Sequence, residues 1–166
     1  MKKNIFRRRK LGKTDYGKRK KMLRSNSPRI VFRRTNRYVI AQYVTSEEAK
    51  DKVEIGVTSR NLKEYGWPEK FSGSLRSITA SYLTGLLIGK KILKEKKEMP
   101  IFDFGMISSE HKTRPYAFLK GLVDAGLKIS HDKKIFPEED RIKGKHLKED
   151  FSGLFEKIKS KIEAEK

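Results

Sequence analysis

Arginine and lysine are the side chains of this sequence whose type and spacing most clearly predict chemistry. Two basic runs lie near the N-terminus, Arg7-Arg8-Arg9-Lys10 and Lys18-Arg19-Lys20-Lys21. Guanidinium forks match phosphate oxygens through paired hydrogen bonds and also stack on bases. Across the chain, 41 Lys and Arg outnumber 21 Asp and Glu, which gives a net charge of +20. A polyanionic partner is therefore expected, and nucleic acid is the class that suits these groups best.

The first 27 residues are predicted to form a basic arm. This segment has too few apolar side chains to fold by itself, so we expect it to become ordered on binding, with a short helix over residues 16–24. Two other interpretations remain: a solvated tail or localisation signal, and an anchor on anionic membranes. The membrane interpretation is the weakest, because the arm lacks the apolar face of a helix that lies on a bilayer.

A second group of cations follows in the first segment that is expected to fold. Arg29, Arg33, Arg34 and Arg37 lie on or beside a predicted strand, and strand periodicity puts Arg29, Val31 and Arg33 on one face. Cations on a rigid strand indicate a docking surface more strongly than cations on a tail. Ordinary solvent-facing sheet charges are the alternative interpretation.

Catalytic and metal-binding patterns are weak. The chain has no cysteine, and its three histidines, His111, His131 and His146, are far apart and lack zinc-site spacing. Asp103-Phe104-Gly105 matches a kinase tripeptide, but no glycine-rich phosphate loop accompanies it. We expect Asp103 to bond nearby backbone or a basic side chain. A nuclease would need a second carboxylate beside it to hold a metal, so we predict no enzymatic activity, no metal and no cofactor.

The folded body is predicted to begin with a three-stranded antiparallel meander. Its strands are expected at residues 29–34, 37–45 and 52–59, and Thr35-Asn36 suits a tight turn between the first two. The third strand alternates, which predicts that its apolar residues share one face: Val53, Ile55 and Val57.

Two helices and one more strand are expected after the meander. A helix over residues 73–95, capped by Ser72 or Ser74, leads to a buried strand at 101–105, which should join the sheet in parallel. Pro115 and Gly126 mark the ends of a second helix. The small-residue pair Gly85 and Gly89 predicts close packing of the first helix on the sheet. Trp67 is expected to cover the edge of the core.

The predicted organisation is a single α/β domain with two appendages. A basic arm (1–27) precedes an α/β domain (28–148), and an amphipathic C-terminal helix occupies 149–166, with a brief helical turn expected after Pro137. The sheet is small and mostly antiparallel, with one crossover strand, and two helices pack on it. The longest nearly apolar run, 80–88, is too short to span a membrane.

Five strings of residues stand out along the chain. They are Gly12-Lys-Thr-Asp-Tyr16, Glu64-Tyr-Gly-Trp67, Ser81-Tyr-Leu-Thr-Gly-Leu-Leu87, Leu119-Lys-Gly-Leu-Val-Asp-Ala-Gly-Leu127 and Arg141-Ile-Lys-Gly-Lys-His146. Together they resemble the archaeal-type family of large-subunit ribosomal protein eighteen, whose eukaryotic counterpart is large-subunit protein five. The similarity runs in order from about residue 7 to residue 148.

The resemblance implies a non-catalytic role in the cytoplasmic ribosome. Members of this family bind 5S rRNA and help to fix it in the central protuberance, where they also contact 23S-type rRNA and neighbouring proteins, including the other main 5S-binding protein. It also implies a ribonuclease-H-like fold without that enzyme's carboxylate cluster. Together with the basic clusters, it gives these candidate RNA contacts: Arg7, Arg8, Arg9, Lys10, Lys13, Thr14, Tyr16, Arg19, Lys20, Arg24, Arg29, Arg33, Arg34, Asn36 and Arg37, with Arg141, Lys143 and His146 as weaker candidates.

Overall fold

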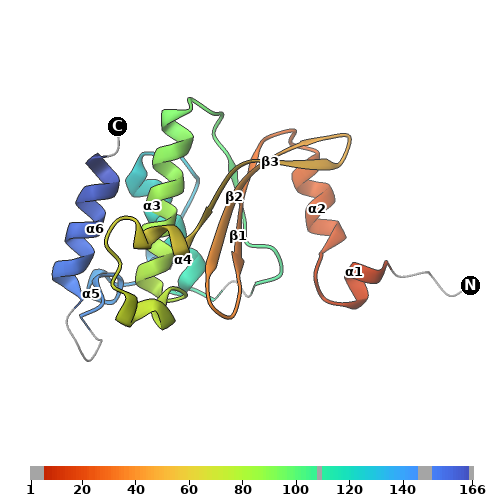
Figure 1. Cartoon of the computed structure of the whole chain (residues 1–166). Coiled ribbons are helices and arrows are strands. Elements are labelled where there is room, and N and C mark those ends of the chain that lie inside the picture. The colour runs from red at the N-terminus through yellow and green to blue at the C-terminus, as the bar shows by residue number, and fades with distance from the viewer. Residues whose placement is uncertain (1–5, 108–109, 146–150, 165–166) are drawn as a thin grey trace, which may run out of the picture.

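The computed structural model describes residues 6–107, 110–145 and 151–164. A four-stranded sheet separates two unequal layers (Figure 1). One face, here called the inner face, is covered by the main helices. The opposite, outer face carries the helices of the N-terminal arm (Figure 1). The strand order is β3-β2-β1-β4, with β1 (Arg29–Arg34), β2 (Val39–Glu47), β3 (Lys50–Thr58) and β4 (Ile101–Asp103).

The meander and its parallel fourth strand confirm the predicted α/β architecture. β1 pairs antiparallel with β2, and β2 with β3, whereas β4 lies parallel to β1 with Phe102 opposite Ile30. The first turn differs from the prediction. The backbone N–H of Thr35 donates to the Tyr38 carbonyl, and the Thr35 hydroxyl accepts from the Tyr38 N–H, both at 2.9 Å. The connection therefore spans Thr35 to Tyr38, so β2 begins at Val39.

The second hairpin is longer and tighter than expected. Both strands continue to a turn at Glu48 and Ala49, whose φ values of 46° and 65° are positive although neither residue is glycine or asparagine. The predicted common face of β3 is also wrong. Ile55 and Val57 are buried on the inner face, but Val53 is 48% exposed on the other side. An irregular register is the cause, because Tyr43 pairs with Ile55 and its neighbour Val44 pairs with Val53.

The long crossover helix, α3 (Ile78–Lys94), packs on the inner face. Its N-cap is Ser77, whose side chain accepts from the Ala80 N–H, rather than the predicted Ser72 or Ser74. Those two serines lie in a short 3-10 helix, η2 (Glu69–Ser74). Another 3-10 segment, η1 (Ser59–Lys63), follows β3. The crossover enters β4 parallel to β1, as predicted. The strand ends at Asp103 rather than at residue 105, and it is not buried throughout, because Ile101 is 37% exposed.

Glycines set the distance between α3 and α4 (Arg114–Ala125). A Cβ on Gly85 would lie 2.2 Å from the Phe118 carbonyl oxygen, and one on Gly121 would lie 2.2 Å from that of Tyr82. The small-residue pair was expected to fit the sheet, but its close neighbour is α4. As predicted, α4 has Pro115 in its first turn and ends at Gly126, with φ 111°.

The C-terminal helix α6 (Ser152–Ala164) completes the core beside α3 (Figure 1). It contributes Phe155, Ile158 and Ile162, all buried. Trp67 is 3% exposed, and its ring centroid lies 4.8 Å from that of Phe151, which confirms that it covers the core edge. A 3-10 turn, η3 (Lys133–Ile135), and a short helix, α5 (Glu139–Lys143), the turn expected after Pro137, join α4 to this region.

Candidate nucleic-acid interface

The basic arm contains two short helices, α1 (Arg7–Lys10) and α2 (Tyr16–Leu23). Asp15 caps α2, because its carboxylate accepts from the backbone N–H groups of Gly17 at 2.9 Å and Lys18 at 3.1 Å. The Arg8 side chain donates to the Thr14 hydroxyl at 2.9 Å and so joins the two helices. The helix expected over residues 16–24 is therefore confirmed to within one residue.

Helix α2 lies against the outer face, on the side of the sheet away from α3 (Figure 1). The Arg19 guanidinium makes a forked contact with Asp51, with Nη1 2.7 Å from Oδ2 and Nη2 3.0 Å from Oδ1, and also donates to the Ala49 carbonyl at 3.1 Å. At the other sheet edge, the Lys18 ammonium lies 4.0 Å from Asp103 and 5.3 Å from the Phe104 ring centroid. The helix therefore bridges β3 and the end of β4.

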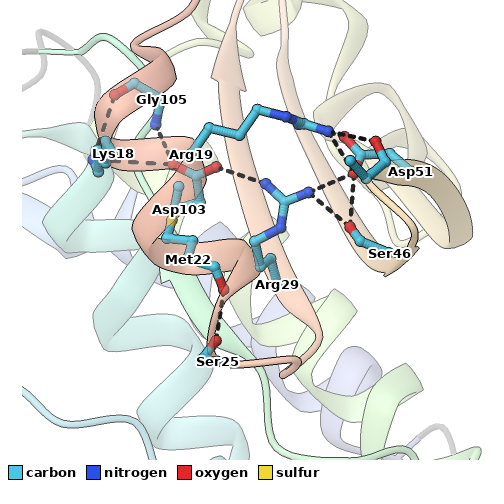
Figure 2. Close-up of polar contacts among 10 residues, drawn as sticks. Lys18, Arg19, Met22, Ser25, Arg29, Ser46, Asp51, Asp103 and Gly105 are labelled. Atoms are coloured by element: carbon cyan, nitrogen blue, oxygen red, sulfur yellow. Dashed lines mark hydrogen bonds and ion pairs between the residues drawn. The ribbon is translucent and has the colours of Figure 1, made fainter.

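Arg29 links the same two carboxylates from below the helix (Figure 2). Its Nη2 donates to Asp51 at 2.8 Å and to the Ser46 hydroxyl at 3.1 Å, and its Nη1 reaches Asp103 at 3.5 Å. The Asp103 side chain also accepts from the Gly105 N–H at 2.8 Å, as the sequence prediction for this residue required. All four strands and α2 are thus joined by one network of ion pairs and hydrogen bonds.

Electrostatics within the network favour the charged forms. Burial alone would raise the pKa of Asp51, but hydrogen bonds from Arg19 and Ser46, together with the Arg29 charge, lower that pKa to about 2. The same hydrogen bond raises the pKa of Arg19 against the opposing effect of burial. Both side chains are therefore fully charged at neutral pH.

The irregular register of β3 makes this network possible. With regular alternation from Ile55, Asp51 would face the inner layer. Glu54 is an extra residue between the Tyr43–Ile55 and Val44–Val53 pairs, so Asp51 faces outward instead. Its partner across the strands, Ser46, belongs to the network as well.

Arg29 and Arg19 differ from the free cations that the sequence suggested. Arg29 does lie on the outer face, as predicted, but it is only 3% exposed, and Asp51 and Asp103 neutralise it. Arg19 is also paired. Their role in this structure is to hold the arm on the sheet, which leaves RNA contact by either side chain a prediction.

A cleft of about 780 Å³ separates the arm from the outer face and β4. Arm side chains such as Lys13 and Tyr16 line one wall, and Arg33 and Met106 belong to the other side. The Tyr16 ring packs on Phe6, with centroids 5.0 Å apart. Basic side chains outnumber acidic ones in the lining of the cleft, so phosphate can approach it.

Most of the other candidate contacts are exposed. Within the described residues, no carboxylate lies at ion-pair distance from these exposed cations: Arg7, Arg8, Arg9, Lys10, Lys13, Lys20, Arg24, Arg33, Arg34 and Arg37. Thr14 is half-buried against Arg8, and Asn36 is exposed in the first hairpin turn. The arm and Arg33 on the outer face of β1 therefore present an unneutralised basic surface, which we call the arm surface.

The weaker candidates lie elsewhere. Arg141 is exposed on α5, whereas Lys143 lies 3.7 Å from Glu156 of α6. His146 lies outside the described residues. Two arginines that sequence reasoning missed, Arg76 and Arg114, lie near Arg34 and Arg141 at the start of the main helices. Their positions beside the predicted starts of two helices could have identified them from the sequence, because anions bind at helix N-termini.

Chemistry of other kinds finds little support in the described residues. They contain no group of three or more His, Cys, Asp and Glu side chains arranged to hold a metal ion. None of their helices is both long enough and apolar enough to cross a membrane.

Comparison with known proteins identifies the family. Residues 2–102 match the sequence model described as "Ribosomal large subunit proteins 60S L5, and 50S L18". The chain is 44% identical to large ribosomal subunit protein uL18 of Korarchaeum cryptofilum over 142 residues, which is 86% of this chain and 71% of that protein. It is 39% identical to uL18 of Methanococcoides burtonii over 165 residues, or 96% of this chain and 93% of that protein.

The chain belongs to the uL18 family. The resemblance found in the sequence motifs is thereby confirmed, and uL18 of Methanoregula boonei extends it with 42% identity over 142 residues. Members are structural proteins of the large ribosomal subunit, so this uL18-family chain is a non-catalytic ribosomal constituent that associates with rRNA and other ribosomal proteins. The unneutralised arm surface is the part of the structure suited to that association.

Proposed function

We propose that this uL18-family chain binds 5S rRNA through the arm surface and helps to anchor it to 23S-type rRNA in the central protuberance. The observation that carries the proposal is that some basic residues are ion-paired within the protein and others are not. Arg19 pairs with Asp51, and Arg29 pairs with Asp51 and Asp103, and these ion pairs fix α2 on the sheet. The exposed cations around them keep their charge free for phosphate.

A docked α2 matters for affinity. Cations on a positioned helix lose less conformational freedom on binding than cations on a free tail, because part of the ordering has already occurred. The ion-pair network positions Lys20 and Arg24 relative to Arg33 on β1. Such a surface recognises the shape and phosphate spacing of a folded RNA, with little reading of base edges.

Salt dependence of 5S rRNA binding tests the arm surface. Replacing Arg7, Arg8 and Arg9 together by Ala should reduce the slope of log affinity against log salt concentration by roughly 2 to 3. Each lost phosphate contact reduces the magnitude of that slope by about 0.7–0.9. A matched control removes three exposed cations from the helical side of the molecule: Arg60, Lys94 and Lys128. An arm variant with the wild-type slope would remove the arm from the interface.

Location in the subunit needs a separate measurement. A tagged chain should co-purify with 5S rRNA in assembled large subunits, and chemical probing should protect 5S phosphates near the arm. Duplex DNA and anionic vesicles, offered in competition with 5S rRNA at equal phosphate concentration, should displace it poorly. Equal displacement by either would favour a non-specific polyanion-binding module instead.

A further inference from the structure

A second group of cations lies at the end of the molecule where the two main helices begin. Gly85 approaches Phe118, and Gly89 approaches Ala125, so α3 and α4 run parallel and their N-terminal ends are together. In Figure 1 these ends lie beside the β1–β2 hairpin and α5. The N-terminal end of a helix carries a partial positive charge, and here two such ends coincide.

Four arginines from four separate segments lie near these helix ends. Arg76 precedes the N-cap of α3, and Arg114 is the first residue of α4. Arg34 is the last residue of β1, two positions beyond Phe32, whose ring lies 5.1 Å from that of Phe118 in α4. Strand alternation therefore puts Arg34 on the inner side of the sheet end. Arg141 comes from α5. We call these four residues the helix-end cluster.

The helix-end cluster is not neutralised within the described residues. Each acidic side chain at the start of α5 is paired with a lysine instead: Glu138 with Lys112 at 3.4 Å, Glu139 with Lys120 at 3.6 Å, and Asp140 with Lys145 at 2.8 Å. Among the carboxylates that the structure describes, none lies at ion-pair distance from the four arginines.

The side chain of Arg114 has an unsatisfied hydrogen-bond donor. Its Nε is buried without a hydrogen-bond partner in the structure. Burial, followed by the charges of Arg34, Arg76 and Arg141, lowers the pKa of Arg114 from its usual range. Four like charges held together at this end destabilise the free protein, and an anion would relieve both the repulsion and the unpaired N–H.

We propose that the helix-end cluster is a second RNA-binding site, which holds backbone phosphates of an rRNA segment other than the 5S segment on the arm surface. Arginine forks and helix N-termini are both suited to phosphate oxygens. The cluster lies at the helix-layer side of the sheet, whereas the arm lies on the outer face, so the two sites face different directions (Figure 1). That the arm surface binds 5S rRNA rests on the proposed function, whereas the observations on the helix-end cluster do not depend on it.

The experiment uses a double variant, Arg76→Gln/Arg114→Gln. Its control, Arg60→Gln/Lys128→Gln, removes the same charge from exposed positions outside the cluster. Each full-length chain is first saturated with 5S rRNA and then titrated with overlapping transcripts of 23S-type rRNA. We expect the cluster variant to bind the best transcript at least about 10-fold more weakly, the effect of losing two phosphate contacts. Its affinity for 5S rRNA and that of the control should change less than about threefold.

Other results distinguish the hypotheses. Equal capture of the transcripts by the cluster variant and the control would overturn the second site. If the cluster variant also loses affinity for 5S rRNA, the cluster belongs to the 5S-binding surface, and the proposal is overturned. If polyglutamate at equal charge displaces the transcripts, the partner is an acidic protein, and the proposal is again overturned. If no chain binds 5S rRNA but the transcript difference persists, the proposed function fails and the second site stands. Should the first variant unfold, Arg76→Gln/Arg141→Gln, which alters two exposed side chains of the cluster, gives the same test.

Discussion

Arg29 has two carboxylate partners and almost no contact with solvent, so its removal should affect folding before binding. Arg29→Ala leaves Asp103, itself nearly buried, without its arginine partner, and should lower the free energy of unfolding by about 3 kcal/mol. Arg33→Ala is the matched control two positions along the same strand, where the side chain is exposed, and should change stability by less than about 0.5 kcal/mol. Urea unfolding measures both, and equal losses would show that the network does not stabilise the fold.

Asp51 predicts a pH dependence with a definite sign. Its pKa falls to about 2 on folding, from an ordinary value of 3.8, so the charged carboxylate contributes stability above about pH 4. That contribution disappears as the pH falls toward 2. Because the side chain is 34% exposed, solvent screening limits it to about 1 kcal/mol.

Asp51→Asn should therefore be less stable than the wild type at pH 6, with the difference shrinking steadily in unfolding curves recorded between pH 4 and pH 2.5. The variant should also release α2, which amide hydrogen exchange of residues 18–23 would report. If the stability difference between Asp51→Asn and the wild type does not change with pH, then uncharged hydrogen bonds at position 51, such as that with the Ser46 hydroxyl, hold the network rather than the Asp51 charge.

At the scale of elements, the α3–α4 contact depends on glycine. A methyl group on Gly85 would meet the backbone of Phe118, which cannot rotate away as a side chain can. Gly85→Ala should therefore separate the helices and destabilise the protein by about 2 kcal/mol or more. Gly153→Ala in α6 is the control, since its Cβ would meet nothing within 4 Å, and it should be neutral or stabilising by up to about 1 kcal/mol. Thermal unfolding of both variants checks the contrast.

The elements also show what a sequence can reveal. The order of the strands, the parallel crossover and the ends of α4 follow from local signals, namely apolar alternation, Pro115 and Gly126, and these were predicted correctly. The ends of β2, β3 and β4 differ from those predicted. The bulge at Glu54 was not predicted, because the register of β3 depends on its partner strand. The sequence alone does not show whether a polar residue pairs regularly or forms a bulge.

The candidate site divides in the same way. Arm cations are visible as runs in the sequence, and so is the short helix that carries some of them. The pairing of Arg19 with Asp51, 32 positions away, depends on tertiary structure, and so does the meeting of Arg76 with Arg114. Tertiary structure gives Arg19 and Arg29 a structural role, while RNA contact by either side chain stays a prediction, and it reveals the helix-end cluster.

At the scale of the whole molecule, a net charge of +20 on a small chain makes the fold sensitive to ions. The arm surface and the helix-end cluster hold cations without carboxylate partners in the described residues, so their repulsion is strongest at low ionic strength. Raising NaCl from about 10 to 150 mM shortens the screening length from about 30 to 8 Å. The thermal midpoint of the free chain should therefore rise by several degrees, roughly 2–4 °C for each kcal/mol of relieved repulsion.

Anion type separates general screening from binding at the helix-end cluster. At constant ionic strength, replacing chloride by sulfate should raise the midpoint of the wild-type chain further, because oxyanions that bind only the folded state stabilise it. Sulfate also strengthens burial generally, so Arg76→Gln/Arg114→Gln must be compared with Arg60→Gln/Lys128→Gln. The cluster variant should start from a higher midpoint in chloride and gain less from sulfate, whereas the control should gain as much as the wild type. Equal gains in all three chains would mean that the four arginines repel one another without binding an oxyanion.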